Sequence, residues 1–296
     1  MGELPKVYVE GAFGTIGAMV WDDLASDGRI ELLAKIPRGE GSDGERRLAL
    51  AEADLAIVCA EGEALASVEA MVGSSAKILD VSAARRHAPG WAYALPELAG
   101  RADQIRASHR AANPGCFASA AILIIEPLAR AGLIDKNAGL AVQAVGGYST
   151  GGKKMAERAR SGLLISDAMH GLADPHPHAR EIQAACGLLQ APAFYPWVGI
   201  FERGMMAQAS WVKSEELNME MVERAYVDAF AGSASVNFER ASEARADCGE
   251  LVGTGRAIVR AVESEGMITC ICTLDNLGKG GGLSAALAAR MMLGLA

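Results

Sequence analysis

Cys116 is the residue whose type and position most strongly suggest covalent chemistry. It follows Asn113, Pro114 and Gly115 and precedes an apolar run of helical length, residues 117–125. Because Pro and Gly end the preceding element, we expect Cys116 in the first turn of a helix, where unpaired amide N–H groups favour an anion. A cysteine there is favoured as a thiolate, the nucleophilic form. The alternative is a buried apolar cysteine that begins a core helix.

Two histidines, His176 and His178, could supply a proton relay beside such a nucleophile. Histidine has an ordinary pKa of about 6.5 and both accepts and donates protons near neutral pH. Pro177 disfavours helix between them, so we expect an extended segment with the two rings on opposite sides and a helix that starts at Ala179. The alternatives are two exposed loop histidines or a zinc site, but further ligands at metal spacing are absent.

A glycine-rich segment, residues 146–153, could bind an anion. Its backbone N–H groups, the Ser149 hydroxyl and the ammonium group of Lys153 or Lys154 are suitable donors. The alternative for both lysines is a solvated helix face.

The elements that would position these residues begin with a strand, a glycine-rich turn and a helix. Residues 6–10 have a strand pattern, the turn reads G-x-x-G-x-x-G, and residues 18–25 have a helical pattern. That order places a pyrophosphate on a helix N-terminus, although a glycine-rich turn without a ligand would also explain it. The residues expected to bind a dinucleotide are Gly11, Gly14, Thr15, Ile16 and Gly17.

Two cations indicate which dinucleotide binds. The second predicted strand, residues 30–34, is followed by Lys35 and Arg38, where an Asp or Glu would select NAD. Positive charge at this position suits a ribose 2′-phosphate. The sequence therefore predicts NADP as the cofactor.

Strand and helix patterns divide the chain into two parts. From residue 6 to about residue 109, apolar strands such as 55–60 and 76–81 alternate with helical stretches, which is typical of a parallel sheet with crossover helices. After Cys116, longer helices are interleaved with strands such as 139–145, 207–212 and 266–274, which indicates a mixed α+β domain. A length of 296 residues fits two domains.

Seven motifs occur in the order found in N-acetyl-gamma-glutamyl-phosphate reductases. They are GAFGTIG at residues 11–17, DVSAARR at 80–86, YALPEL at 93–98, NPGCF at 113–117, GYSTGGK at 147–153, HPHARE at 176–181 and LDNLGKG at 274–280. The chain resembles the shorter subgroup of that family and, more distantly, the aspartate-semialdehyde dehydrogenases. The resemblance covers nearly the whole chain, and residues 155–174 depart from it because they lack the aromatic-rich stretch of the short subgroup.

The resemblance implies an α/β fold with two domains. A Rossmann-type parallel-sheet dinucleotide-binding domain is expected to accompany an α+β catalytic and dimerisation domain of the glyceraldehyde-phosphate-dehydrogenase-like type. Because the final helix, residues 283–295, should return to the first domain, we expect a discontinuous NADP-binding domain. Its predicted bounds are 1–114 and 278–296, and those of the catalytic and oligomerisation domain are 115–277. The assembly is expected to be a homodimer or homotetramer.

The resemblance also assigns roles to individual residues. It places the catalytic histidine in the H-x-H-x-x-E motif, and we choose His178 as the acid, with His176 as the alternative. Arg86 matches the family arginine that would bind the leaving phosphate, and Asn276 matches the position that holds the nicotinamide carboxamide. Ser82 is expected to bind the cofactor. The predicted substrate-binding residues are Arg86, Ser149, Lys153, His176 and Arg203.

The implied function is NADPH-dependent reduction of N-acetyl-gamma-glutamyl phosphate to N-acetylglutamate semialdehyde and phosphate, a step of arginine biosynthesis. The Cys116 thiolate would attack the acyl phosphate, phosphate would leave, and hydride transfer to the thioester would give a thiohemiacetal that collapses with protonation by His178. The alternatives are the same chemistry on another acyl phosphate such as aspartyl phosphate, or a catalytically silent NADP-binding regulator. The joint presence of Cys116, His178 and Arg86 argues against the regulator.

Composition narrows the classes of partner. A formal charge of −8 argues against nucleic acid, which requires a clustered basic excess. No apolar run reaches the roughly 18 residues of a membrane span, and no signal-peptide pattern is present, so we expect a cytoplasmic protein. The six cysteines are too scattered for a disulfide framework. We predict no metal site, because Cys270 and Cys272 are better explained as one face of a strand.

Overall fold

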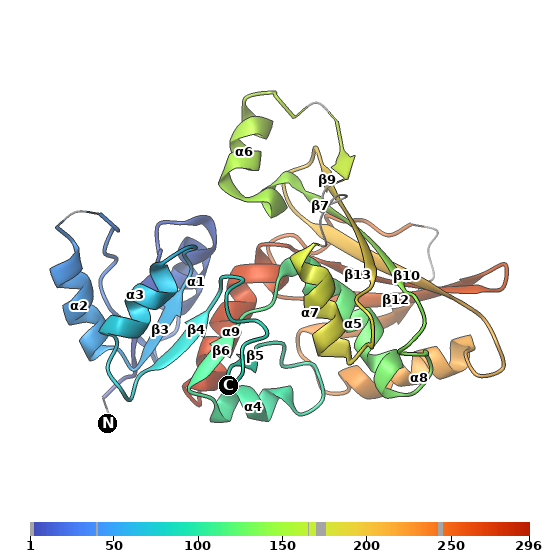
Figure 1. Cartoon of the computed structure of the whole chain (residues 1–296), viewed down its shortest axis with the longest axis horizontal. Coiled ribbons are helices and arrows are strands. Elements are labelled where there is room, and N and C mark those ends of the chain that lie inside the picture. Colours follow the sequence, from blue (N-terminus) through green and yellow to red (C-terminus); the bar gives the residue numbers. More distant parts are fainter. Residues whose placement is uncertain (1–2, 40, 165, 170–175, 242–244) are drawn as a thin grey trace. The chain divides into compact units, whose positions relative to one another are not determined.

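The computed structural model describes residues 3–39, 41–164, 166–169, 176–241 and 245–296 (Figure 1). The chain divides into two compact units. The first unit combines Met1–Pro114 with Gly281–Ala296, and the second is Gly115–Gly280. Part of the segment that departs from the family pattern, residues 165 and 170–174, lies outside the described residues.

The first unit contains a parallel six-stranded sheet with the order β2-β1-β3-β4-β6-β5. Its strands are β1 (Lys6–Glu10), β2 (Glu31–Leu32), β3 (Leu55–Val58), β4 (Lys77–Asp80), β5 (Ala92–Tyr93) and β6 (Arg110–Ala112). Its helices are α1 (Thr15–Ala25), α2 (Asp43–Glu52), α3 (Ala64–Met71), α4 (Arg101–Ala107) and α9 (Leu283–Met292). The predicted Rossmann-type parallel sheet is therefore confirmed.

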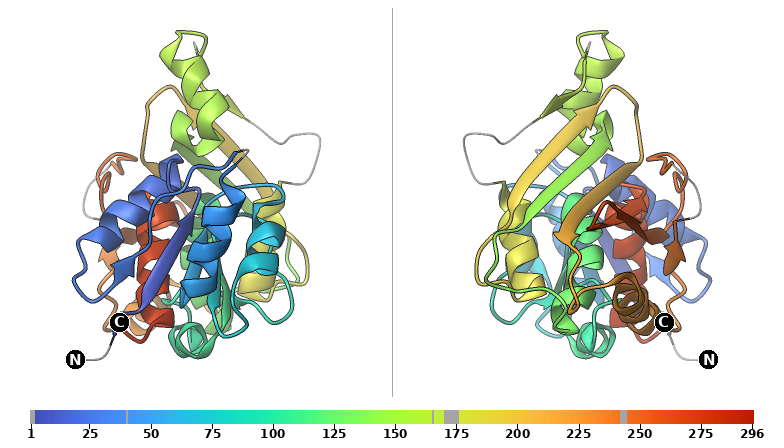
Figure 2. Two further views of the ribbon diagram at one scale, coloured as in Figure 1. Left: turned by 90° about the vertical axis from the view of Figure 1, so that its left-hand side faces the viewer. Right: turned by 90° about the vertical axis from the view of Figure 1, so that its right-hand side faces the viewer.

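Alternating side chains of the parallel sheet build a core on each of its faces. Val7 and Val9 of β1 pack in one core with α1 and α9, whereas Tyr8 packs in another core with Leu50 of α2 and Val68 of α3. Figure 2 shows α9, in red, beside α1. Because both faces are covered, the carboxyl edge of the strands is the part of the sheet that leads into loops suited to binding.

The second unit contains a mixed seven-stranded sheet with the order β11-β12-β13-β10-β7-β9-β8. Its strands are β7 (Ala141–Gly147), β8 (Ala168–Met169), β9 (Ala193–Gly199), β10 (Met205–Val212), β11 (Val236–Arg240), β12 (Ala257–Ser264) and β13 (Met267–Leu274). Its helical segments are α5 (Cys116–Arg130), η1 (Tyr148–Gly151), α6 (Gly152–Arg160), α7 (Pro177–Cys186) and α8 (Met219–Phe230), and η2 (Gly278–Gly282) begins in this unit and ends in the first. The predicted α+β pattern is thus present.

One face of the mixed sheet is covered by helices. Helices α5 and α8 pack against it, and Tyr226 of α8 donates a hydrogen bond to the carbonyl of Ile124 in α5 at 2.7 Å. On the other face, Tyr195 and Trp197 of β9 are 38% and 40% exposed. This second face of the sheet, with Val145, Tyr195, Trp197, Met206 and Gln208, is called the open sheet face below.

None of the helices in the described part of the chain is long and apolar enough to span a membrane.

Candidate active site

Cys116 begins helix α5, as its position after Pro114 and Gly115 predicts. Gly115 is the extended N-cap residue, and no side chain caps the helix among the described residues. The remainder of α5 is almost entirely buried, whereas Cys116 itself is half-buried. Cys116 therefore lies in the first turn of a core helix, the end at which the helix dipole is positive.

The loop that follows β13 passes directly against the cysteine. A Cβ atom placed on Gly280 would lie 2.6 Å from the Cβ of Cys116. The Gly280 amide donates to the Asp275 carbonyl at 2.8 Å, which fixes the loop at this position. Glycine is thus required where this loop meets Cys116, a contact that the sequence alone did not indicate.

Glu181 of α7 connects the start of α5 to His178. The carboxylate is buried, its Oε1 accepts a hydrogen bond from the Gly115 amide at 2.7 Å, and its Oε2 lies 4.0 Å from His178 Nε2. Since Gly115 immediately precedes Cys116, this carboxylate connects helix α7 to the first turn of α5. In the sequence, the three-residue spacing of Glu181 from His178 within the H-x-H-x-x-E motif is the one signal of this contact.

The two histidines do not point in opposite directions, so that expectation was wrong. Helix α7 starts at Pro177 rather than Ala179, because Pro is favoured at the first helical position. His176 is the N-cap and accepts a hydrogen bond from the His178 amide through Nδ1 at 3.2 Å. The two rings consequently lie with their centroids 4.7 Å apart.

Aromatic residues enclose both imidazoles. The His178 ring lies 6.1 Å from Phe117 and 6.2 Å from Phe194 in edge-to-face geometry, and the His176 ring is 5.1 Å from Phe194. Because Phe117 directly follows Cys116, its ring carries the contact from the start of α5 to His178. Apolar contacts of this kind restrict the imidazole to a small range of orientations.

A hydrogen-bonded cluster brings Ser149, Arg203 and Asn276 together. Asn276 Nδ2 donates to Ser149 Oγ at 2.8 Å, and Asn276 Oδ1 accepts from the Gly204 amide at 2.9 Å. Ser149 Oγ also donates to the Glu202 carbonyl at 2.6 Å. Asn276 is almost fully buried, so its amide fixes the surrounding backbone from both ends.

Arg203 is paired with a buried carboxylate. Its Nε and Nη2 lie 2.7 Å and 2.6 Å from the two oxygens of Asp275, which is fully buried. The same carboxylate accepts hydrogen bonds from the amides of Gly253 and Leu277. Lys153, by contrast, is exposed near the start of α6.

The glycine-rich turn of the first unit has the backbone shape that a pyrophosphate requires. Gly11 has a positive φ of 81°, and a Cβ on Gly17 would lie 2.1 Å from the Gly11 carbonyl oxygen. Helix α1 begins at Thr15, directly after Gly14. Glycine is therefore obligatory at two positions, and the cradle with its helix N-terminus fits a dinucleotide.

The other predicted residues of the first unit lie at the carboxyl ends of its strands or in the loops that follow. Ser82 follows β4, and its amide donates to Asp80 Oδ1 at 2.9 Å. Arg86 Nε donates to the carbonyl of Asn113 at 3.0 Å, three residues before Cys116 in the chain. Lys35 and Arg38 follow β2 and have different neighbours. Lys35 lies over the Trp21 ring, and Arg38 pairs with Glu10.

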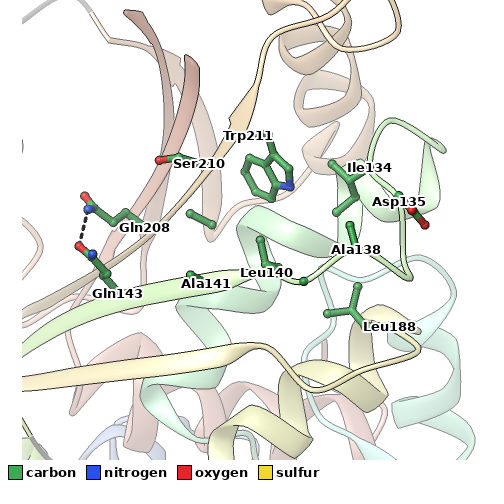
Figure 3. A pocket seen from close by; sticks show the side chains of 12 residues that line it. Ile134, Asp135, Ala138, Leu140, Ala141, Gln143, Leu188, Gln208, Ser210 and Trp211 are labelled. Carbon is green, nitrogen blue, oxygen red and sulfur yellow. Dashed lines mark hydrogen bonds between the residues drawn. The ribbon is translucent and has the colours of Figure 1, made fainter. Parts of the chain in front are cut away.

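A pocket elsewhere in the second unit is separate from these residues. Figure 3 shows it, with Ile134, Leu140, Leu188 and Trp211 among the side chains that line it. Gln143 and Gln208 form a hydrogen bond of 3.0 Å at its edge. No residue predicted to bind substrate or cofactor lines this pocket. Within the described ranges, no group of three His, Cys, Asp or Glu residues is arranged to hold a metal ion.

Comparison with known proteins gives relatives along nearly the whole chain. A family model described as "Semialdehyde dehydrogenase, dimerisation domain" matches residues 116–276. The chain is 34% identical to the N-acetyl-gamma-glutamyl-phosphate reductase of Sinorhizobium medicae (strain WSM419), covering 93% of this chain and 94% of that protein. It is 33% identical to the protein of that name from Brucella ovis, covering 98% and 99%.

The solved structures point to the same fold. Aspartate semialdehyde dehydrogenase II from Vibrio cholerae is similar to this chain with a TM-score of 0.75 and 16% identity, covering 98% of this chain and 99% of that one. At this identity the similarity establishes the fold alone.

Proposed function

This chain belongs to the N-acetyl-gamma-glutamyl-phosphate reductases, within the semialdehyde dehydrogenases, and from this premise we propose that it reduces N-acetyl-gamma-glutamyl phosphate to N-acetylglutamate semialdehyde and phosphate. The observation that carries the proposal is the arrangement of Cys116, Glu181 and His178 around the start of α5. A nucleophile and an acid–base group held by one buried carboxylate suit a covalent reduction through a thioester.

The proposed first step is acyl transfer to sulfur. The Cys116 thiolate forms a bond to the acyl carbon, the bond from that carbon to the phosphate oxygen breaks, and inorganic phosphate leaves with the electron pair. The N-terminus of α5 favours the thiolate, and its amide groups also suit negative charge on the acyl oxygen. We propose Arg86 as the cation that stabilises the leaving phosphate.

His178 is proposed to donate a proton to the substrate oxygen as the thiohemiacetal forms and to take that proton back when the thiohemiacetal collapses, so that the carbon–sulfur bond breaks, the aldehyde carbonyl forms and the sulfur leaves as the thiolate. Glu181 beside Nε2 and the two phenylalanine rings orient its imidazole. His176 caps α7, so its proposed role on the substrate side is combined with a structural one. Substrate binding is further proposed for Ser149, Lys153 and Arg203. Because Arg203 is paired with Asp275, its proposed role is to hold the backbone around the substrate in position.

A nicotinamide cofactor fits the glycine cradle, and we propose that it is NADP. When bound, it supplies the hydride that reduces the thioester. The proposed contacts are Gly11, Gly14, Thr15, Ile16, Gly17, Lys35, Arg38, Ser82 and Asn276. The two cations after β2 support the 2′-phosphorylated form, because no acid follows that strand until Glu40. On this proposal the first unit is the NADP-binding domain and the second is the catalytic domain.

The family model describes a dimerisation domain, and we propose that the assembly is a homodimer or homotetramer formed in the cytoplasm. The open sheet face supports this proposal. Trp197, Val145 and Met206 lie side by side in the register of three neighbouring strands and line a shallow hollow. Exposed aromatic and apolar groups on one sheet face are typical of subunit contacts.

One assay tests the proposed substrate. The purified protein is supplied with NADP⁺, phosphate and either N-acetylglutamate semialdehyde or aspartate semialdehyde, and NADPH formation is followed by absorbance. We expect the acetylated aldehyde to give at least about a hundredfold higher kcat/KM, since buried groups that recognise the acetamide would be left unpaired by the smaller aldehyde. Faster turnover of aspartate semialdehyde would be consistent with the proposed reaction type but would contradict N-acetylglutamate semialdehyde as the substrate.

A further inference from the structure

A buried carboxylate lies directly before the glycine-rich turn, and the proposed reaction does not use it. Glu10 is the last residue of β1 and is fully buried. The Tyr8 hydroxyl donates to its Oε2 at 3.1 Å. Burial, together with the charge of Glu10, raises the pKa of Tyr8, so the phenol remains protonated and acts as the donor. Glu10 is therefore built into the edge of the sheet where the cofactor is proposed to bind.

Arg46 of α2 neutralises this carboxylate. Its Nε lies 3.2 Å from Glu10 Oε2, its Nη2 lies 3.2 Å from Oε1, and its side chain is only 5% exposed. The remaining contacts of the guanidinium group are with Asp43 Oδ1 at 2.8 Å and Ser67 Oγ at 3.3 Å. Every nitrogen of the Arg46 guanidinium group thus has a partner inside the protein, and the side chain is buried.

Arg38 approaches the same carboxylate from the segment after β2. Its Nε lies 3.3 Å from Glu10 Oε1, but its side chain is 43% exposed. Two guanidinium groups and one carboxylate leave one net positive charge, and it is on the exposed partner. Asp43 is 75% exposed, so solvent screens its charge. Lys35 stands apart, with its ammonium over Trp21 and 3.8 Å from Asp22.

We propose that Arg46 sets the cofactor preference without touching the cofactor, because its neutralisation of Glu10 leaves the charge of Arg38 available to a ribose 2′-phosphate. The inference rests on the proposed use of NADP. Without Arg46, the only other cation at the buried carboxylate among the described residues is Arg38. A buried carboxylate strongly favours pairing with a cation, so Arg38 would be drawn to Glu10 and its charge would be cancelled.

Cofactor affinity tests this inference without any measurement of turnover. The dissociation constants of NADPH and NADH are measured by the fluorescence of each reduced cofactor, and their ratio reports recognition of the 2′-phosphate. Arg46→Met should lower the preference for NADPH about tenfold or more, the value of a charge-assisted hydrogen bond. Arg38→Met should lower it similarly, and the affinity for NADH should change little in both variants.

A double variant separates charge from packing. Glu10→Gln combined with Arg46→Met removes both charges of the buried pair and leaves Arg38 with its own charge, so the preference for NADPH should return to near the wild-type ratio. Glu10→Gln alone should keep the ratio at or above that of the wild type. Arg290→Met, which removes a partly buried pairing with Asp23 and Asp27 in the same unit, is the matched control and should leave the ratio unchanged.

The outcomes separate a failure of this inference from a failure of the proposal that the cofactor is NADP. Equal affinity of the wild type for both cofactors would reject NADP itself and the inference with it. A wild-type preference for NADPH combined with a lower ratio in Glu10→Gln would reject the inference alone, because Glu10 would then act by holding Arg38 in place. A ratio that stays low in the double variant would also reject it. If Arg46→Met fails to fold, the preference of Glu10→Gln for NADPH over NADH still tests the inference.

Discussion

At the scale of single residues, the candidate site depends on one carboxylate that contacts two elements at once. Glu181 accepts a hydrogen bond from the Gly115 amide, just before Cys116, and lies beside the imidazole proposed as the acid. A buried carboxylate with these two neighbours is unlike the exposed Arg180 that precedes it in α7. The pair therefore offers a variant and its control within one helical turn.

Glu181→Gln is expected to lower kcat about tenfold to a hundredfold with little change in KM. The amide keeps the size of the side chain but weakens the orientation of His178, so part of the roughly 10²–10⁴-fold contribution of acid–base catalysis is lost. Steady-state kinetics in the aldehyde-oxidising direction measures the effect. Arg180→Ala should behave as the wild type. An unchanged kcat in Glu181→Gln would mean that the carboxylate does not position the histidine.

Cys116→Ser is expected to lose several orders of magnitude in turnover while NADPH still binds. A hydroxyl at the start of α5 is far less acidic than a thiol, so the nucleophile is absent at neutral pH. Turnover and the cofactor dissociation constant are measured on the same preparation. Near wild-type turnover would remove Cys116 from the mechanism.

Residue types and short spacings made part of the site predictable. Asn-Pro-Gly before an apolar run indicated that a helix starts at Cys116, because Pro and Gly act locally on the backbone. The pairing of Arg203 with Asp275 and the contact of Gly280 with Cys116 could not be predicted. They join residues 72 and 164 positions apart, and only the folded chain brings them together.

At the scale of elements, two glycines allow close approaches that a side chain would prevent. The first is Gly280, which brings the loop after β13 against the start of α5. The second is Gly17, which packs α1 onto the carbonyl of Gly11. At both positions the protein atoms nearest to an added Cβ belong to a neighbouring segment of the chain.

Gly280→Ala is expected to lower kcat about a hundredfold, because the new methyl group would lie 2.6 Å from the Cys116 Cβ and displace the sulfur. The rate of thiol alkylation by iodoacetamide gives a second readout of the cysteine's environment. Gly139→Ala is the control in the same unit, since nothing lies within 4 Å of its added Cβ. Wild-type turnover in Gly280→Ala would show that the loop moves to accept the methyl group and that Cys116 keeps its position.

Gly17→Ala is expected to destabilise the first unit by about 1–3 kcal/mol and to weaken NADPH binding. Its Cβ would lie 2.1 Å from the Gly11 oxygen, so α1 must move away from the turn that forms the cradle. Thermal unfolding and cofactor fluorescence measure the two effects. Gly28→Ala has open space around the added Cβ and should change neither. Unaltered cofactor affinity would place the pyrophosphate elsewhere.

The expectation that His176 and His178 lie on opposite sides was wrong because of where helix α7 starts. Pro177 was interpreted as a residue that prevents helix, but at the first helical position the missing N–H and fixed φ favour one. The same residue therefore moved the helix start from Ala179 to Pro177 and placed both rings together. Local rules predicted the existence of α7, whereas its first turn depended on the capping by His176.

At the scale of the whole molecule, the open sheet face is where copies of the chain are proposed to meet. Trp197→Asp is expected to raise the dissociation constant of the assembly about 30-fold or more, since truncating a central interface aromatic residue costs about 2 kcal/mol or more. Sedimentation velocity over a range of protein concentrations measures it. Val227→Lys changes an exposed apolar residue of α8 and should leave the assembly intact. An unchanged assembly in Trp197→Asp would place the contact on another surface.

The return of residues 281–296 to the first unit has a consequence during synthesis on the ribosome. Helix α9 fills the core beside Val7, Val9 and Leu24 with its buried alanines and methionines. Residues 281–296 are translated after the whole of the second unit, so the part of the nascent sheet that α9 covers stays uncovered until then. The first unit is therefore completed only after the second unit has been translated, and the valines of β1 that α9 covers are the side chains that a chaperone would have to shield in the interval.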